Sequence, residues 1–328
     1  MSMIPMLIAG AALGALAGAS VPATSAFSPN APSVSNVSNV SAGHVTVVHA
    51  DKLLMGDGST VDHGSIVIEN GKITAVGAGI DAPAGASVVE HTGWASAGLI
   101  ALHSYSGSVG EMRDSTRAVL DGHVAVAFDP QHCDFKDALA AGITTIVLTP
   151  TPQSLSGGTA AAVKTARGGV LTTDAFLSLG LSEAALANNR FPTSYAGALA
   201  ELDRRFDAPV GGFAKALDGT LPVMFEVDTR ADVQRALELA ARRKLKGALH
   251  GAEWSGELAE PVKKSGLAVV LGPFDVGTER RTLLSAVELA KHDVALGFGL
   301  DVPGYHPEGL RLSAALCLRE GLPRAAAW

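Results

Sequence analysis

Hydrophobic and polar residues alternate along residues 44–95 in a way that is typical of β-strands. The run HVTVVHADKLL at residues 44–54 places its apolar side chains on one face of an extended chain. The run GSIVIENGKITAVG at residues 64–77 holds two further β-rich segments, which are separated by Asn70-Gly71. An Asn-Gly pair in this position favours a type I′ hairpin turn, because both residues tolerate a positive φ. The pattern predicts a small all-β unit over residues 44–95.

After residue 95, apolar strands alternate with amphipathic helices. Repeated βα units of this spacing indicate an α/β protein with a parallel sheet. Six strands stand out, and one or two more are doubtful; residues 159–181 are ambiguous, with a hairpin as one interpretation. Such a count is compatible with a (β/α)8 barrel of the TIM type over residues 96–328. The six strands are expected at residues 97–103, 144–150, 221–227, 245–251, 267–273 and 294–300, and the helices at 134–143, 194–206, 229–244, 255–266, 279–292 and 307–321.

The two ends of the chain lie outside this repeating pattern. Residues 3–23 carry no charge, and Thr24 and Ala26 provide the small residues of a cleavage site, so residues 1–26 are predicted to be a signal peptide. An uncleaved membrane anchor is the alternative, because the apolar run is about long enough to span a bilayer. Residues 27–43 are rich in Ser, Asn and Pro and are predicted to be a flexible linker. Either reading predicts an exported protein, periplasmic or secreted. Residues 325–328 resemble the start of a helix that is not completed, so the barrel is expected to be truncated at its C-terminus.

Composition narrows the range of functions. The chain has 328 residues, of which 47% are hydrophobic, so it can bury a large core. Its net charge of -7 argues against a nucleic-acid partner, which would call for a basic surface. Cys133 and Cys317 are the two cysteines, and their wide separation excludes a disulfide framework. A small molecule is therefore the expected partner, and no membrane contact is expected beyond the signal segment. The sequence does not predict an oligomeric state.

Four polar residues fall at the carboxyl ends of predicted strands, where the sites of (β/α)8 barrels lie. His103 ends the first strand, and Glu226 lies near the end of the strand LPVMFEV, on the same face as Met224. His250 ends the strand LKGALH, and Asp301 follows the run VALGFGL. Imidazole and carboxylate groups are suitable ligands for Zn²⁺, Fe or Mn. His103, Glu226, His250 and Asp301 are therefore candidate ligands for one divalent ion.

Each of these residues also has a structural interpretation. A single histidine at a strand end is more often a hydrogen-bonded structural residue than a metal ligand. Asp301 could hold a turn or cap a helix, and Glu226 could pair with an arginine. Their shared position at the same end of the strands favours the metal interpretation.

The run VHADKLLMGDGSTVDHGSIVIENGKITAVG, followed by GLIALHS, resembles the start of the amidohydrolase superfamily in its imidazolonepropionase- and prolidase-like branch. The resemblance covers about residues 46–328. It implies a β-sandwich that is formed in part by residues 44–95, and a (β/α)8 barrel that holds one or two divalent ions. It also implies an activity in which metal-activated water attacks an amide or related C–N bond. By the same resemblance, His103 and His250 correspond to metal-binding histidines of strands one and six. Asp301 corresponds to the strand-eight aspartate that transfers a proton, and so is the candidate catalytic residue.

The sequence departs from the family pattern at three positions. Ala101 stands in place of an aspartate, Tyr105 in place of the second histidine of strand one, and Glu226 near the position of the strand-five histidine. A phenol ionises near pH 10 and is a poor substitute for neutral imidazole. A two-metal site is therefore not expected. The sequence predicts at most one ion, and zinc is favoured over iron or manganese. The family's C-terminal segment, which completes the sandwich, has no counterpart here.

Two hypotheses follow from these departures. The first is an amidohydrolase-like, metal-dependent hydrolase that acts on a C–N bond with a single ion. The second is a catalytically inactive protein of the same fold that holds no metal and serves as a binding or structural module. The two differ in whether the four candidate ligands converge on one point.

Overall fold

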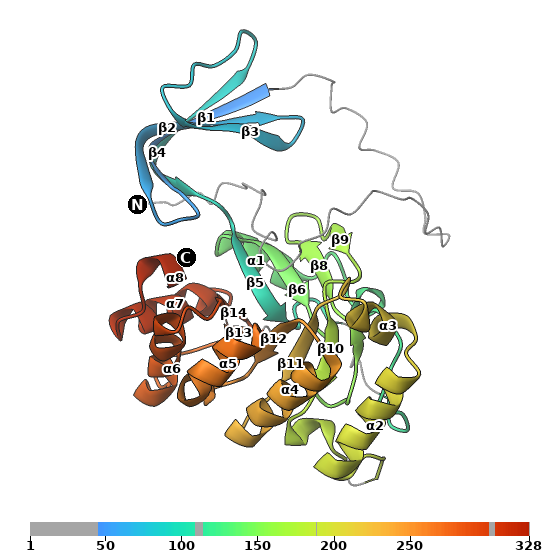
Figure 1. The fold of residues 1–328 in the computed structure, drawn as a ribbon. Coiled ribbons are helices and arrows are strands. Elements are labelled where there is room, and N and C mark those ends of the chain that lie inside the picture. Colours follow the sequence, from blue (N-terminus) through green and yellow to red (C-terminus); the bar gives the residue numbers. More distant parts are fainter. Residues whose placement is uncertain (1–44, 109–113, 188, 302–305, 328) are drawn as a thin grey trace, which may run out of the picture. The chain divides into compact units, whose positions relative to one another are not determined.

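The computed structural model describes residues 45–108, 114–187, 189–301 and 306–327. The predicted signal peptide and linker, residues 1–26 and 27–43, lie outside these residues. The chain divides into two compact units between Gly98 and Leu99, shown in Figure 1. None of the helices in the described part of the chain is both long and apolar enough to cross a membrane.

The first unit is built on one four-stranded sheet with the strand order β3-β2-β1-β4. The pairs β1–β2 and β2–β3 are antiparallel, and the pair β1–β4 is parallel. The predicted hairpin is confirmed, because Asn70 and Gly71 have φ values of 52° and 76° and Glu69 pairs with Lys72 across the turn. A small core lies on one face of the sheet around Val48, Leu53 and Ile66. The strands are β1 (Val45–Leu54), β2 (Thr60–Glu69), β3 (Lys72–Ala78) and β4 (Ser87–Ser96).

The second unit has a mixed α/β architecture with two sheets. One sheet has the strand order β14-β13-β12-β11-β10-β7, in which β10 to β14 are parallel. The other has the order β5-β6-β8-β9, in which β5 and β6 are parallel. The ten strands are β5 (Leu99–Ser104), β6 (Ile143–Leu148), β7 (Gly158–Thr159), β8 (Ala161–Lys164), β9 (Val170–Thr172), β10 (Leu177–Gly180), β11 (Val223–Glu226), β12 (Gly247–His250), β13 (Ala268–Leu271) and β14 (Leu296–Phe298).

Backbone hydrogen bonds join the two sheets at both of their ends. The N–H of Leu300, just after β14, donates to the carbonyl of His103 in β5 at 2.7 Å. Ala160, between β7 and β8, exchanges hydrogen bonds with Ala175 and Phe176, just before β10, at 2.9 Å each. The strands β5 and β14 therefore terminate side by side, although they are the first and last strands of this unit in the sequence.

The six strands predicted after residue 95 are all confirmed, with their bounds shifted by one or two residues. The ambiguous residues 159–181 form the short strands β7 to β10, and β8 runs antiparallel to β6. One helix, α3, has no counterpart in the sequence prediction because its seven residues are too few to show a helical period. The helices are α1 (Cys133–Ala140), α2 (Tyr195–Asp207), α3 (Gly211–Leu217), α4 (Arg230–Arg243), α5 (Ala259–Ser265), α6 (Arg280–Lys291), α7 (Gly309–Arg319) and α8 (Arg324–Ala327), with 3₁₀ turns at Val124–Val126, Glu183–Ala185 and Ser255–Leu258.

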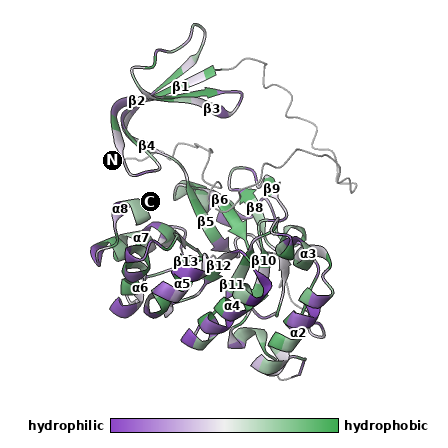
Figure 2. Cartoon of the chain, in the orientation of Figure 1, coloured by the Kyte–Doolittle hydropathy of each residue, from purple (hydrophilic) through white to green (hydrophobic). Residues whose placement is uncertain are grey.

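Packing of the second unit separates two apolar layers. The larger one lies between the strands and the helices, and it includes Phe225 of β11 and Leu249 of β12. In Figure 2 the helices carry purple polar stretches, whereas the strands that they flank are mainly green. A smaller layer lies on the other face of the same strands, around Met224, Ala248 and Val270. Side chains two apart on a strand share a face, so Glu226 and His250 continue the face of Met224 and Ala248.

Local sequence fixes the positions of the elements next to these strands. Thr229 and Asp232 form a capping box, in which each side chain accepts a hydrogen bond from the backbone of the other residue. This box starts α4 immediately after β11. Gly247 starts β12 with a φ of 148°, and a Cβ there would lie 1.8 Å from the carbonyl oxygen of Val223. Only glycine allows β11 and β12 to approach in this way.

A pair of glycine substitutions tests this requirement. Gly247→Ala should cost several kcal/mol of unfolding free energy, because a methyl group cannot share space with the backbone of β11. Gly266→Ala, at a helix end where φ is 74° and no atom lies within 4 Å, should cost only about 1 kcal/mol. Urea unfolding followed by circular dichroism measures both. Equal losses in the two variants would contradict the close approach at Gly247.

Candidate metal centre

The four predicted ligands come together at the carboxyl ends of four strands. Glu226 and His250 are the last residues of β11 and β12 and are paired in the sheet register. His103 lies one residue before the end of β5. Asp301 follows β14, and the hydrogen bond from Leu300 to His103 holds it beside β5. Because parallel strands end at one edge of a sheet, residues far apart in the sequence meet here.

Glu226 contacts both histidines. Its Oε2 lies 2.7 Å from Nδ1 of His250, and its Oε1 lies 3.2 Å from Nε2 of His103. The two imidazole rings are stacked, with centroids 3.5 Å apart and planes inclined by 13°. His103 is fully buried, and Glu226 and His250 are 5% and 7% exposed. A buried carboxylate is stable only when its oxygens are hydrogen-bonded or paired with charge, and the two rings meet this need.

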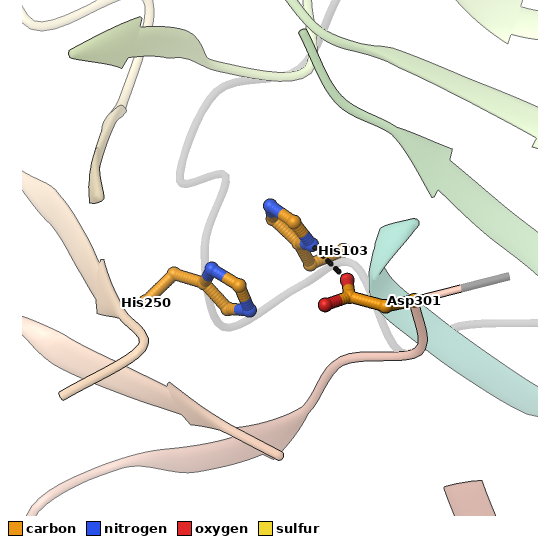
Figure 3. Close-up of side chains that lie close together, drawn as sticks. All are labelled: His103, His250 and Asp301. Atoms are coloured by element: carbon orange, nitrogen blue, oxygen red, sulfur yellow. Dashed lines mark hydrogen bonds and ion pairs between the residues drawn. The ribbon is translucent and has the colours of Figure 1, made fainter. Parts of the chain in front are cut away.

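Asp301 lies on the other nitrogen of His103. Its Oδ1 is 3.3 Å from Nδ1 of His103. Figure 3 marks this contact with a dashed line. The side chain of Asp301 is 35% exposed, so this carboxylate is the member of the group that solvent reaches most readily. A ring nitrogen of His250 points toward Asp301 in the same view.

Buried charge determines the electrostatics of the group. Burial by itself would lower the pKa of His103, but the negative charge of Glu226 and the hydrogen bonds that His103 donates to Asp301 and Glu226 outweigh it and raise this pKa to about 9. Burial would raise the pKa of Glu226, but the two imidazoles lower it well below its ordinary value. In the absence of a metal ion, the group therefore contains a carboxylate paired with a protonated His103 at neutral pH.

Three of the four residues could hold a metal ion together. His103, His250 and Asp301 each offer one ligand atom, and these atoms lie within 4.8 Å of one another. Glu226 is not a member of this group, since both of its oxygens face the imidazoles. Nε2 of His250 is buried and has no hydrogen-bond partner among the described residues. A buried nitrogen without a partner is costly, and two imidazoles with one carboxylate are a donor set suited to zinc or iron. The residues present thus fit one ion.

A second group of potential ligands, His132, Cys133 and Asp134, lies at the start of α1. Nδ1 of His132 accepts a hydrogen bond from the backbone N–H of Asp134 at 3.3 Å and thereby caps the helix. Gly107 donates to Oδ2 of Asp134 at 2.8 Å. These contacts account for His132 and Asp134 as structural residues.

Tyr105 lies beside the candidate ligands but is not one of them. Its ring meets His103 edge to face, with centroids 5.2 Å apart. Burial, and then the negative charges of Glu226 and Asp301, raise the pKa of its phenol far above 10. The phenol is therefore protonated at every physiological pH and can only donate or accept a hydrogen bond.

The structure adds one residue that the sequence analysis did not single out. Oγ1 of Thr149, just after β6, lies 3.2 Å from Nε2 of His103 and 3.3 Å from the carbonyl of Ser104. Its position directly after a buried strand was the available signal, but threonine is common in such places. The strand β10, next to β11, is followed by Leu181-Ser182, which offer neither an amine nor a carboxylate.

Replacing Glu226 tests its role as the shared partner. Glu226→Gln should destabilise the metal-free protein by about 3–5 kcal/mol, because it leaves a buried imidazolium without its counter-charge. Glu238→Gln, at an exposed position on α4, should change the unfolding free energy by no more than about 0.5 kcal/mol. Urea unfolding at pH 6.5 with a chelator measures both variants. A loss below 1 kcal/mol in Glu226→Gln would show that the pair contributes little.

Stability of the metal-free protein should fall as the pH rises. The pKa of His103 is raised from 6.5 to about 9, so its contribution is complete below pH 6.5 and is lost as the pH passes through about 9. The loss should be on the order of 3 kcal/mol. Urea unfolding at pH 6.5 and 9.5 measures it. His103→Gln should show a smaller difference between the two pH values, and an unchanged difference would assign the effect to other groups.

Comparisons with known proteins support the fold. No model of a known protein family matches the sequence, and no curated protein matches it. Among solved structures, an amidohydrolase from Thermotoga maritima superposes with a TM-score of 0.71 at 17% identity, over 85% of this chain and 85% of that chain. Another amidohydrolase superposes with a TM-score of 0.50 at 18% identity, over 86% of this chain and 84% of that chain. The resemblance found in the sequence is therefore confirmed at the level of the fold: this chain is built on the fold of the amidohydrolases.

Proposed function

We propose that this protein is a metal-dependent hydrolase with a single divalent ion, held by His103, His250 and Asp301, and that it acts on a C–N bond of a small molecule. The observation that carries the proposal is the buried, unpartnered Nε2 of His250, which lies with ligand atoms of His103 and Asp301 in one group. Zinc is the ion that we favour, with iron or manganese as alternatives. The shared fold with amidohydrolases of known structure supports the choice of reaction.

A (β/α)8 barrel is part of this proposal. The backbone hydrogen bonds between Leu300 and His103, and between Ala160 and Phe176, support a continuous ring made of the two sheets. In such a ring the layer around Met224, Ala248 and Val270 is the interior, and the metal group lies above it at the carboxyl ends of the strands. This is the end at which barrel enzymes bind their substrates.

Each residue of the group has a separate role in the proposed reaction. A bound divalent ion lowers the pKa of water and polarises a carbonyl group, which makes hydrolysis feasible at neutral pH. Glu226 holds Nδ1 of His250 at 2.7 Å, so that Nε2 is the nitrogen left for an ion. Asp301 is the most exposed carboxylate of the group, so it can accept a proton from water and return it to the leaving nitrogen. The phenol of Tyr105 is a permanent hydrogen-bond donor for a substrate oxygen.

A second candidate function is a binding or structural module without catalysis. The specific observation in its favour is that Glu226 contacts one nitrogen of each histidine in the absence of an ion, and that both nitrogens of His103 already face carboxylates. For His103 to bind an ion, it must lose its extra proton and one of these contacts. The competition between the ion pair and a metal decides between the two functions.

Metal content distinguishes the two candidates. We expect about one zinc, iron or manganese per chain by elemental analysis of the purified protein. His250→Ala should abolish this content, whereas His292→Ala, a histidine of the α6 C-terminus outside the group, should retain it. Absence of metal after incubation with excess zinc would favour the non-catalytic module. Loss of metal in His132→Ala, with retention in His250→Ala, would instead place the ion at the start of α1.

Export is a further part of the proposal, and it rests on residues 1–26 of the sequence. Expression of the full chain in a bacterium should release a periplasmic protein that begins at Phe27, as determined by N-terminal sequencing of the periplasmic fraction. An intact N-terminus in the membrane fraction would identify the segment as an anchor.

A further inference from the structure

A cavity of about 360 Å³ lies at the same strand ends as His250 but is lined by other residues. One wall is the segment that follows β12 and contains Glu253 and Trp254. The opposite wall is the segment that follows β13, with Phe274, and the start of α6, with Glu279. The volume lies in the range of small-molecule sites. The polypeptide passes from His250 to Glu253 in three residues, so this cavity adjoins the proposed metal centre along the chain.

The walls of the cavity are fixed by hydrogen bonds from buried residues. Ser285 Oγ donates to the carbonyl oxygen of Glu253 at 2.7 Å, and Ser313 Oγ accepts from the N–H of Phe274 at 2.7 Å. Both serines are buried, at 7% and 0% exposure. Such contacts hold the backbone of both walls in place and leave the side chains of Glu253 and Glu279 to meet a ligand.

The two carboxylates of the cavity have no cationic partner. In the part of the chain that the structure describes, the side chains of Glu253 and Glu279 take part in no hydrogen bond and no ion pair. The one basic residue that lines the cavity, Arg281, is already neutralised: it donates to Glu257 and stacks on the ring of Trp254, with its Cζ 3.8 Å from the ring centroid. The cavity therefore keeps an excess of negative charge.

Neighbouring carboxylates add to the negative potential around Glu253. Partial burial, and then the charges of Asp228 and Glu279, raise the pKa of the Glu253 carboxyl above its ordinary value. A positively charged group in the cavity would relieve this repulsion, and the aromatic rings of Trp254 and Phe274 would cover the apolar part of a ligand. An anionic ligand would instead increase the repulsion in the cavity.

We propose that the cavity between Glu253 and Glu279 binds the cationic end of the substrate, so that the preferred substrates carry an ammonium or guanidinium group in addition to the C–N bond that is cleaved. The assignment of the ligand as a substrate rests on the proposed hydrolase function. Binding of the cation itself does not, because no proposed metal ligand lines the cavity.

Calorimetric titration of the metal-free protein with arginine amide tests the proposal. This probe carries a guanidinium and an ammonium group and has one amide bond. It should bind at millimolar concentration or below, and the double substitution Glu253→Gln with Glu279→Gln should weaken binding tenfold or more. A double substitution with the same change of charge at exposed positions outside the cavity, Glu238→Gln with Glu260→Gln, should leave binding within twofold.

Citrulline amide, which has a neutral side chain of nearly the same shape, should bind at least tenfold more weakly than arginine amide. Equal affinity for the two amides, equal loss in the two double variants, or no binding of arginine amide would overturn the proposal. The same titration on His250→Ala separates this result from the metal site: retained binding without metal would leave the cavity assignment intact even if the hydrolase function fails. Unchanged binding of arginine amide in the cavity double variant, with normal metal content, would reject the cavity assignment alone.

Discussion

The buried carboxylate of Glu226 is the interaction on which the centre of this protein depends. It lies at the end of β11, where each of its oxygens meets an imidazole that arrives from a different strand. A carboxylate that is 5% exposed is stable only with such partners, and the two stacked rings are in turn held together by it. The strand ends β5, β11 and β12 are thereby joined by side chains as well as by backbone hydrogen bonds.

This arrangement requires strands that approach closely and run in parallel. Gly247 lets β12 lie against β11, and the capping box at Thr229 turns the chain into α4 as soon as β11 ends. On the same strand faces, Met224 and Ala248 form an apolar layer that continues into Glu226 and His250. This packed apolar layer therefore supports Glu226 and His250 and fixes their positions at the strand ends.

The same ion pair that stabilises the group would compete with a metal ion at the proposed site. A protonated His103 cannot be a ligand, and its carboxylate partners favour the protonated form. The unpartnered nitrogen of His250 favours an ion, because an ion would satisfy it. A cavity lined by Glu253 and Glu279 follows His250 along the chain, and these two side chains have no cationic partner among the described residues. The carboxyl ends of the strands therefore carry acidic groups both at the proposed metal site and at the proposed substrate subsite.

The sequence alone determined the elements and the positions of the candidate ligands. The hairpin at Asn70-Gly71, the capping box at Thr229 and the six apolar strands depend on local chemistry, so they were predictable. Only the tertiary structure decided which groups satisfy one another. Glu226 was expected to be a ligand, yet it faces two imidazoles, and Thr149 joins His103 without any distinctive motif. The sequence likewise did not indicate that the side chains of Glu253 and Glu279 have no cationic partner among the described residues. When a hydrogen-bond partner comes from a different strand, the contact depends on strand register and on how distant chain segments approach each other. His103 and Asp301, for example, are 198 residues apart in the sequence. No local sequence pattern encodes such a contact.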